Sequence, residues 1–111
     1  MNIIICDDED VYLQTISDKV ENWAQRFGRT SAVRFRLFHS SEELLEAWEN
    51  GMKADLIFMD IQIPGEMNGL ALTKYIHETD YYLPIALVTN YGEFVYDGYK
   101  VNALRYLRKP V

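Results

Sequence analysis

Apolar residues occur in two patterns along this chain: short continuous runs, and positions spaced every three or four residues. Continuous runs lie at residues 2–6, 56–59 and 84–89. Two further runs, at 32–38 and 103–107, contain arginine among their apolar residues. A central strand of a parallel sheet is covered on both faces, whereas an edge strand reaches solvent. The pattern therefore predicts five strands, with the second and fifth at the edges of the sheet.

Between these strands the apolar residues take helical spacing. The first predicted helix has its apolar face at Leu13, Ile16, Val20, Trp23 and Phe27. Gly28 follows that face directly, so we expect the helix to end there. Ser40 and Glu43 have the spacing of a capping box and predict the start of a second helix, which ends at Gly51.

The second half of the chain repeats this alternation. A turn-rich stretch at 64–69 precedes a third predicted helix, whose apolar residues are Leu70, Leu72 and Ile76. Residues 91–100 are a weaker helix candidate because two glycines interrupt them. Strands that alternate with helices imply βαβ units and a parallel sheet. With the second and fifth strands at the edges, the strand order is 2-1-3-4-5, which predicts a flavodoxin-like, doubly wound α/β fold.

A length of 111 residues fits one domain, which we place at residues 1–111. The sequence reaches Val111 directly after the fifth predicted strand, where a doubly wound sheet continues into another helix. We therefore expect the final helix to be missing from this chain.

Composition excludes several classes of protein. One cysteine, Cys6, cannot form an internal disulfide, and no apolar run approaches the roughly 20 residues of a membrane span. No signal peptide precedes the first strand, so we expect a cytoplasmic protein without membrane contact. The net charge of −6, with scattered lysines and arginines, disfavours DNA binding by this chain itself.

Polar residues that can support chemistry follow the predicted strands. Asp7 and Asp8 come after the first, Asp60 after the third, Thr89 after the fourth and Lys109 after the fifth. Because ligands bind beyond the carboxyl ends of parallel strands, we expect these side chains to converge. Neighbouring carboxylates repel one another unless a cation lies among them, and oxygen ligands suit Mg²⁺. Such a group of residues can support phosphoryl transfer to a carboxylate.

Four stretches make the sequence recognisable: Cys6-Asp7-Asp8-Glu9, Met59-Asp60-Ile61-Gln62-Ile63-Pro64, Val88-Thr89-Asn90-Tyr91 and Tyr106-Leu107-Arg108-Lys109-Pro110. In this order and spacing they resemble the receiver domains of two-component response regulators. The resemblance covers nearly the whole chain. It implies a signalling domain that a sensor histidine kinase phosphorylates, and not an enzyme in the usual sense.

The resemblance also implies a role for each site residue. Asp60 would be the phosphoacceptor. The Mg²⁺ ligands would be Asp7, Asp8, Asp60 and the main-chain carbonyl of Gln62. Thr89 and Tyr106 would form the coupled switch pair, and Lys109 would sense the phosphoryl group.

Residues 101–110 resemble the receivers of LytTR-class transcription regulators. This likeness implies a C-terminal DNA-binding domain that is missing from the chain, and DNA contact only through that domain. A homodimer is expected if the apolar flank of the first and fifth strands stays uncovered. One feature departs from the family: the stretch from the loop proline to the helix-opening glycine, Pro64 to Gly69, spans six residues, where five are common.

Three other functions remain open. A flavodoxin-like protein would bind FMN, but the acidic run at residues 7–10 would repel its phosphate. A phosphatase with an aspartate nucleophile usually has a second aspartate two residues later, where this chain has Gln62. A degenerate receiver would serve only as a docking module, although all of its phosphorylation positions are filled here. Taken singly, Asp60, Thr89 and Tyr106 also fit ordinary turn, strand-end and packing roles.

Overall fold

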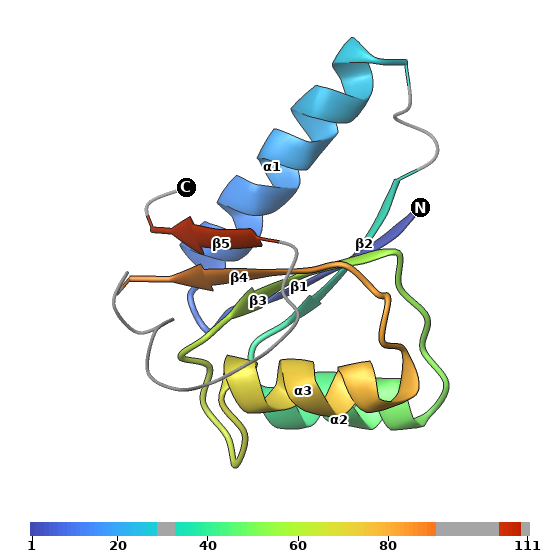
Figure 1. The fold of residues 1–111 in the computed structure, drawn as a ribbon. Coiled ribbons are helices and arrows are strands. Elements are labelled where there is room, and N and C mark those ends of the chain that lie inside the picture. The colour runs from blue at the N-terminus through green and yellow to red at the C-terminus, as the bar shows by residue number, and fades with distance from the viewer. Residues whose placement is uncertain (29–32, 91–104, 110–111) are drawn as a thin grey trace.

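A computed structural model describes residues 1–28, 33–90 and 105–109 of the chain (Figure 1). Five parallel strands form one sheet in the order β2-β1-β3-β4-β5. Their bounds are Asn2–Cys6 for β1, Arg34–Phe38 for β2, Leu56–Asp60 for β3, Ile85–Thr89 for β4 and Arg105–Arg108 for β5. The predicted strand order is confirmed.

Helices cover both faces of this sheet. Their bounds are Asp10–Arg26 for α1, Ser41–Glu49 for α2 and Gly69–Thr79 for α3. Helix α1 lies on one face, and α2 and α3 lie side by side on the other (Figure 1). None of the helices in the described ranges is long and apolar enough to cross a membrane.

The helix ends follow local sequence signals. The Ser40 hydroxyl accepts a hydrogen bond from the Glu43 amide at 3.3 Å, which confirms the predicted N-cap of α2. Asn68 caps α3 in the same way, because its side-chain oxygen accepts from the Ala71 amide at 2.8 Å. Beyond α1, Gly28 adopts a φ of 67°, a left-handed conformation that glycine reaches without strain.

Two apolar layers hold the sheet and helices together. The larger layer lies between the sheet and α2 and α3, with Ile4, Ile57, Met59, Leu70 and Leu87 among its fully buried residues. The smaller layer lies under α1 and contains Ile3, Ile5, Leu13, Ile16 and Val88. Each central strand therefore buries both faces, as its continuous apolar sequence predicts.

The apolar face of α1 is less covered in its second half, although Ala24 there is fully buried. Leu13 and Ile16 are buried, whereas Trp23 is 45% and Phe27 61% exposed. Beside Trp23 lies a groove of about 320 Å³, lined by Met1, Ile3, Lys19, Val20, Trp23 and Leu56. The helical spacing of the apolar residues in α1 was thus predicted correctly. The sequence did not predict how much of that apolar face is buried.

Some predicted elements fall outside the described ranges. Residues 91–100, the weaker helix candidate, are among them, as are residues 103 and 104 of the fifth predicted strand. Strand β2 begins at Arg34, two residues later than predicted, and residue 32 is likewise not described.

Candidate functional site

Three carboxylates meet at the carboxyl ends of β1 and β3. Asp7 and Asp60 are buried, and Asp8 is exposed. One oxygen from each of these residues lies within 4.8 Å of the others. The structure thus brings together three of the predicted metal-binding residues, which belong to two separate parts of the sequence.

Backbone hydrogen bonds orient the two buried carboxylates. The Glu9 amide donates to Oδ1 of Asp7 at 2.9 Å, and the Gln62 amide donates to Oδ1 of Asp60 at 3.1 Å. The Ile61 amide donates to the Val88 carbonyl at 2.9 Å, which extends the β3–β4 pairing beyond Asp60. Each carboxylate therefore has one oxygen fixed by the turn that follows its strand, and its second oxygen faces the cluster.

The start of α3 packs directly against the backbone of Asp60. The Gly69 amide donates to the Ile61 carbonyl at 2.8 Å. A Cβ at Gly69 would collide with the Asp60 carbonyl group and would lie 2.8 Å from the Ile61 Cα. Only glycine allows this approach, so the helix start and the Asp60 backbone are positioned together.

The six-residue stretch from Pro64 to Gly69 packs against α2. The Ser41 amide donates to the Pro64 carbonyl at 3.1 Å, and the Ser41 hydroxyl donates to the same carbonyl at 3.3 Å. Gly65, with a φ of 125°, lies against the Ser41 and Glu42 side chains. The loop is therefore anchored at α2 as well as at α3, close to the Gln62 carbonyl expected to bind metal.

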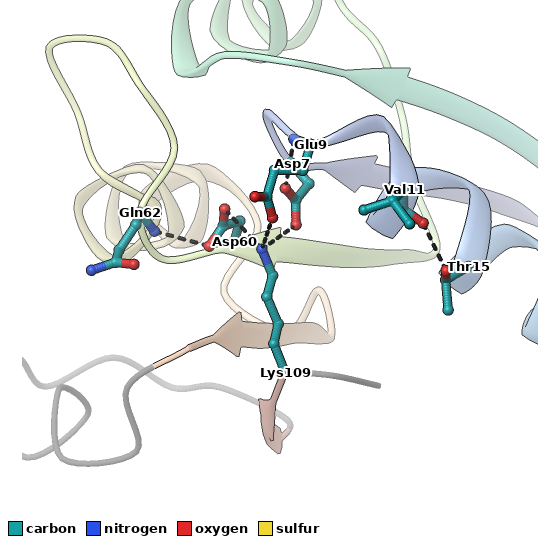
Figure 2. Close-up of polar contacts among 7 residues, drawn as sticks. All are labelled: Asp7, Glu9, Val11, Thr15, Asp60, Gln62 and Lys109. Atoms are coloured by element: carbon teal, nitrogen blue, oxygen red, sulfur yellow. Dashed lines mark hydrogen bonds and ion pairs between the residues drawn. The ribbon is translucent and has the colours of Figure 1, made fainter.

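Lys109 brings a positive charge into the cluster from β5 (Figure 2). Its amide donates to the Thr89 carbonyl at 2.7 Å, which fixes the end of β5 to β4. Its ammonium lies 2.9 Å from Asp7 and 3.5 Å from both Asp60 and Glu9. Only 2% of the Lys109 side chain is exposed, so these carboxylates replace most of the water around the ammonium.

Two contacts of Lys109 were not predicted from the sequence. Glu9 supplies a carboxylate from the rim, where 52% of its side chain is exposed. The ring of Tyr12 lies under the ammonium, with 4.0 Å between Nζ and the ring centroid. Glu9 is the N-cap of α1 and Tyr12 lies three positions later, in the first turn of the helix, and that spacing was the available signal.

Burial dominates the ionisation of the acids. It raises the pKa of Asp60 to about 6, although the Gln62 amide and the Lys109 charge favour the carboxylate. It also raises the pKa of Asp7, against the opposing ion pair with Lys109. For Lys109, burial lowers the pKa, but the hydrogen bond to Asp7 and the nearby acids outweigh this effect and raise it.

The donor set fits a hard divalent cation. All of the converging side-chain donors are carboxylate oxygens, which Mg²⁺ and Ca²⁺ prefer. Their mutual distances, within 4.8 Å, approach the roughly 4 Å that separates opposite oxygens around a Mg²⁺ ion. Asp8 remains exposed at the edge of the cluster, which leaves a side open to solvent and to water ligands.

The predicted switch pair is described only in part. Thr89 is buried at the end of β4, beside the cluster. In the β4–β5 register, Leu87 pairs with Tyr106 and Thr89 with Arg108. Tyr106 thus lies on the strand next to Thr89, but its side chain lies outside the described part of the structure.

Comparison with known proteins agrees with this geometry. A family model described as the response regulator receiver domain matches residues 3–111. The chain belongs to the response regulator receiver family. Receiver domains are signalling domains that interact with histidine kinases and bind Mg²⁺ at an acidic pocket.

Two curated relatives support the resemblance to LytTR-class regulators. The positive alginate biosynthesis regulatory protein of Pseudomonas aeruginosa is 28% identical over 113 residues, which cover 100% of this receiver and 42% of that protein. The sensory transduction protein LytT of Bacillus subtilis is 31% identical over 74 residues, which cover 65% of this receiver and 30% of that protein. The chain therefore matches less than half the length of either relative.

Solved receiver structures share the fold. A CheY-like receiver domain protein from Methanospirillum hungatei has a TM-score of 0.78 and 23% identity, over 99% of this receiver and 82% of that chain. The response regulator TrrA from Thermotoga maritima, in complex with Mg(2+)-BeF, has a TM-score of 0.71 and 26% identity. The match covers 97% of this receiver and 85% of that chain.

Proposed function

We propose that this receiver accepts a phosphoryl group on Asp60 from a sensor histidine kinase in a Mg²⁺-dependent reaction. The observation that carries the proposal is the position of Asp60, a buried carboxylate beside two more carboxylates and the buried Lys109 ammonium. A nucleophilic carboxylate, a cation-binding cluster and a fixed positive charge are what transfer to an aspartate requires.

The reaction uses Asp60 as its carboxylate. Because the Asp60 pKa is about 6, the side chain is mainly ionised at neutral pH. Its Oδ2 atom forms a bond to phosphorus while the bond from phosphorus to the kinase histidine nitrogen breaks. That nitrogen keeps the electron pair and takes up a proton from water. Oδ1 stays hydrogen-bonded to the Gln62 amide, which holds the carboxylate in place during the attack.

Charge neutralisation is the second requirement. Asp7, Asp8, Asp60 and the Gln62 carbonyl would hold Mg²⁺, which supplies positive charge to the phosphoryl oxygens when bound. Lys109 supplies the other positive charge. It pairs with Asp7 and Asp60 here, and after transfer it would pair with a phosphoryl oxygen. The Thr89 hydroxyl would donate a hydrogen bond to another of these oxygens.

The likeness to LytTR-class relatives supports a proposal for what phosphorylation would regulate. We propose that residues 1–111 are the receiver of a longer cytoplasmic transcription regulator, whose separate domain binds DNA. Thr89 and Tyr106 would couple the phosphoryl group to the surface at β4 and β5, and a homodimer would form through the apolar flank of β1 and β5. The backbone bond between Lys109 and Thr89 ties the two strands together at this edge.

Labelling with acetyl phosphate and Mg²⁺ tests the phosphoacceptor. Wild type should gain one phosphoryl group, as seen by intact mass, and Asp60→Asn should gain none. Asp18→Asn is the matched control, because Asp18 is exposed on α1, away from the carboxylate cluster, and accepts a surface hydrogen bond from Gln14. Removal of Mg²⁺ with EDTA should abolish labelling.

Two other labelling results would contradict the proposal. If Asp60→Asn is labelled and Asp7→Asn is not, Asp7 is the acceptor. If folded wild type takes no label from acetyl phosphate or from purified kinases, the chain acts as a docking module without phosphorylation.

A further inference from the structure

Among the residues that the structure describes, the Lys109 ammonium has one close neighbour that carries no net charge, the ring of Tyr12. The ring centroid lies 4.0 Å from Nζ, within the range of a cation–π contact. Asp7, Glu9 and Asp60 provide the other close contacts, all ionic. Tyr12 is half-buried, so the contact is partly shielded from water.

Glu9 and Tyr12 belong to one structural unit. Glu9 is the N-cap of α1, and the Tyr12 amide donates to the Glu9 carbonyl at 3.0 Å. The Glu9 amide in turn donates to Asp7. The first turn of α1 therefore fixes the ring, the rim carboxylate and the closest counter-ion of Lys109 relative to one another.

These partners differ in how they respond to a bound cation. A bound Mg²⁺ ion would partly neutralise the negative charge of Asp7 and Asp60. It would therefore weaken the attraction of these carboxylates for the Lys109 ammonium. Neither Tyr12 nor Glu9 belongs to the carboxylate cluster, so both keep their attraction for the ammonium. Glu9 attracts it toward the solvent-exposed rim, whereas the Tyr12 ring contacts it in its observed buried position, 3.5 Å from Asp60.

We propose that the first turn of α1 sets the position of Lys109 during phosphoryl transfer, with Tyr12 as a positioning residue and Glu9 as a competing counter-ion. The inference rests on the proposed function, because Lys109 acts there on the phosphoryl oxygens. Tyr12 does not touch the reacting atoms. It acts by keeping the ammonium within reach of them, and Glu9 opposes this effect.

A kinetic test distinguishes the effect of the aromatic face of Tyr12 from the effect of its side-chain volume. Tyr12→Leu keeps much of the volume and removes the aromatic face, whereas Tyr12→Phe keeps that face and removes only the hydroxyl. At saturating Mg²⁺ we expect acetyl phosphate to label Tyr12→Leu about two- to tenfold more slowly than wild type. Tyr12→Phe should be labelled at nearly the wild-type rate, and Glu9→Gln faster. Tyr82→Leu controls for the loss of a tyrosine, because the Tyr82 side chain is exposed.

A spectroscopic readout shows the contact itself. In wild type, the ε-methylene protons of Lys109 should show an upfield ring-current shift, assigned by its loss in Lys109→Arg. The shift should persist in Tyr12→Phe and disappear in Tyr12→Leu. Its absence in folded wild type would overturn the proposal without recourse to any Tyr12 variant, even if Tyr12→Leu does not fold.

The two readouts also separate this proposal from the proposed function. Wild type that shows the ring-current shift but takes no label at Asp60 would overturn the proposed function, and the positioning role with it. Wild type that is labelled, with equal rates for Tyr12→Leu and Tyr12→Phe, would overturn the positioning role alone. Slower labelling of Glu9→Gln would overturn the competing role of Glu9.

Discussion

Lys109 lies closer to Asp7 than to Asp60, at 2.9 Å against 3.5 Å from its ammonium. Asp7, directly after β1, is therefore the principal counter-ion of the buried lysine. The Asp60 Oδ2 atom is held less closely and remains available for chemistry. This arrangement makes Lys109 a structural as well as a functional residue, because its removal would leave two buried carboxylates without their cation.

The first prediction concerns this buried charge. Without metal, Lys109→Met should destabilise the domain by about 3 kcal/mol, since it leaves Asp7 and Asp60 uncompensated. The loss should be smaller at acidic pH, where the acids are protonated, and smaller in Mg²⁺. Urea denaturation in EDTA measures it, with Lys53→Met as control at an exposed position. If the loss of unfolding free energy in Lys109→Met does not change with pH, Lys109 stabilises the domain by packing and not by its charge.

A second prediction follows from the Asp60 pKa, which burial raises to about 6. Between about pH 4 and 6 the folded state binds more protons at Asp60 than the unfolded chain does. Its contribution to stability therefore falls as pH rises through this window. Asp60→Asn removes that contribution, so in EDTA the variant should be more stable than wild type above pH 7, by up to about 3 kcal/mol.

The difference between the two proteins should shrink as the pH falls from 6 to 4. Chemical denaturation at matched pH values measures it, and the carboxylates outside the Asp7, Asp8 and Asp60 cluster cancel because both proteins share them. A difference of the opposite sign, with wild type more stable at pH 7, would show that the Lys109 pair outweighs the burial of Asp60.

The third prediction concerns the contact between α3 and Asp60. Gly69→Ala should destabilise the domain by about 1–3 kcal/mol, because the added Cβ must displace the Asp60 backbone. Labelling of Asp60 should slow as well, since its carboxylate moves with that backbone. Gly28→Asn is the control, because Gly28 has open space around it and a φ of 67°, within the left-handed region that asparagine adopts. Equal effects of the two substitutions would contradict the steric argument.

Sequence patterns predicted the fold because each strand reports its own surroundings. The continuous apolar runs of β1, β3 and β4 required burial on both faces, and the arginines of β2 required an edge. The ends of these strands placed Asp7, Asp8, Asp60 and Lys109 at one edge of the sheet. Topology therefore predicted which residues meet, although they are far apart in the sequence.

The sequence did not reveal which pairs within the site are closest. The position of the Lys109 ammonium depends on a balance between Asp7, Asp60, Glu9 and the Tyr12 ring. That balance is set in three dimensions by small differences in distance and burial, which periodicity does not encode. The exposed second half of α1 is a similar case, because an apolar spacing does not specify what packs against it.

The last prediction concerns that exposed half. Trp23 and Phe27 are both exposed, with 5.4 Å between their ring centroids, and Trp23 lines the apolar groove beside Met1 and Val20. Water contact at such a patch is unfavourable, so we expect the 111-residue chain to self-associate as its concentration rises. The double substitution of Trp23→Gln with Phe27→Gln should weaken that association and change the free energy of unfolding little, because neither ring is buried. Sedimentation velocity over a concentration series measures the effect, with Tyr82→Gln as control, since that side chain is exposed and does not line the groove. If the double variant associates as wild type does, another surface mediates the contact. If wild type stays monomeric at every concentration, the patch does not drive association.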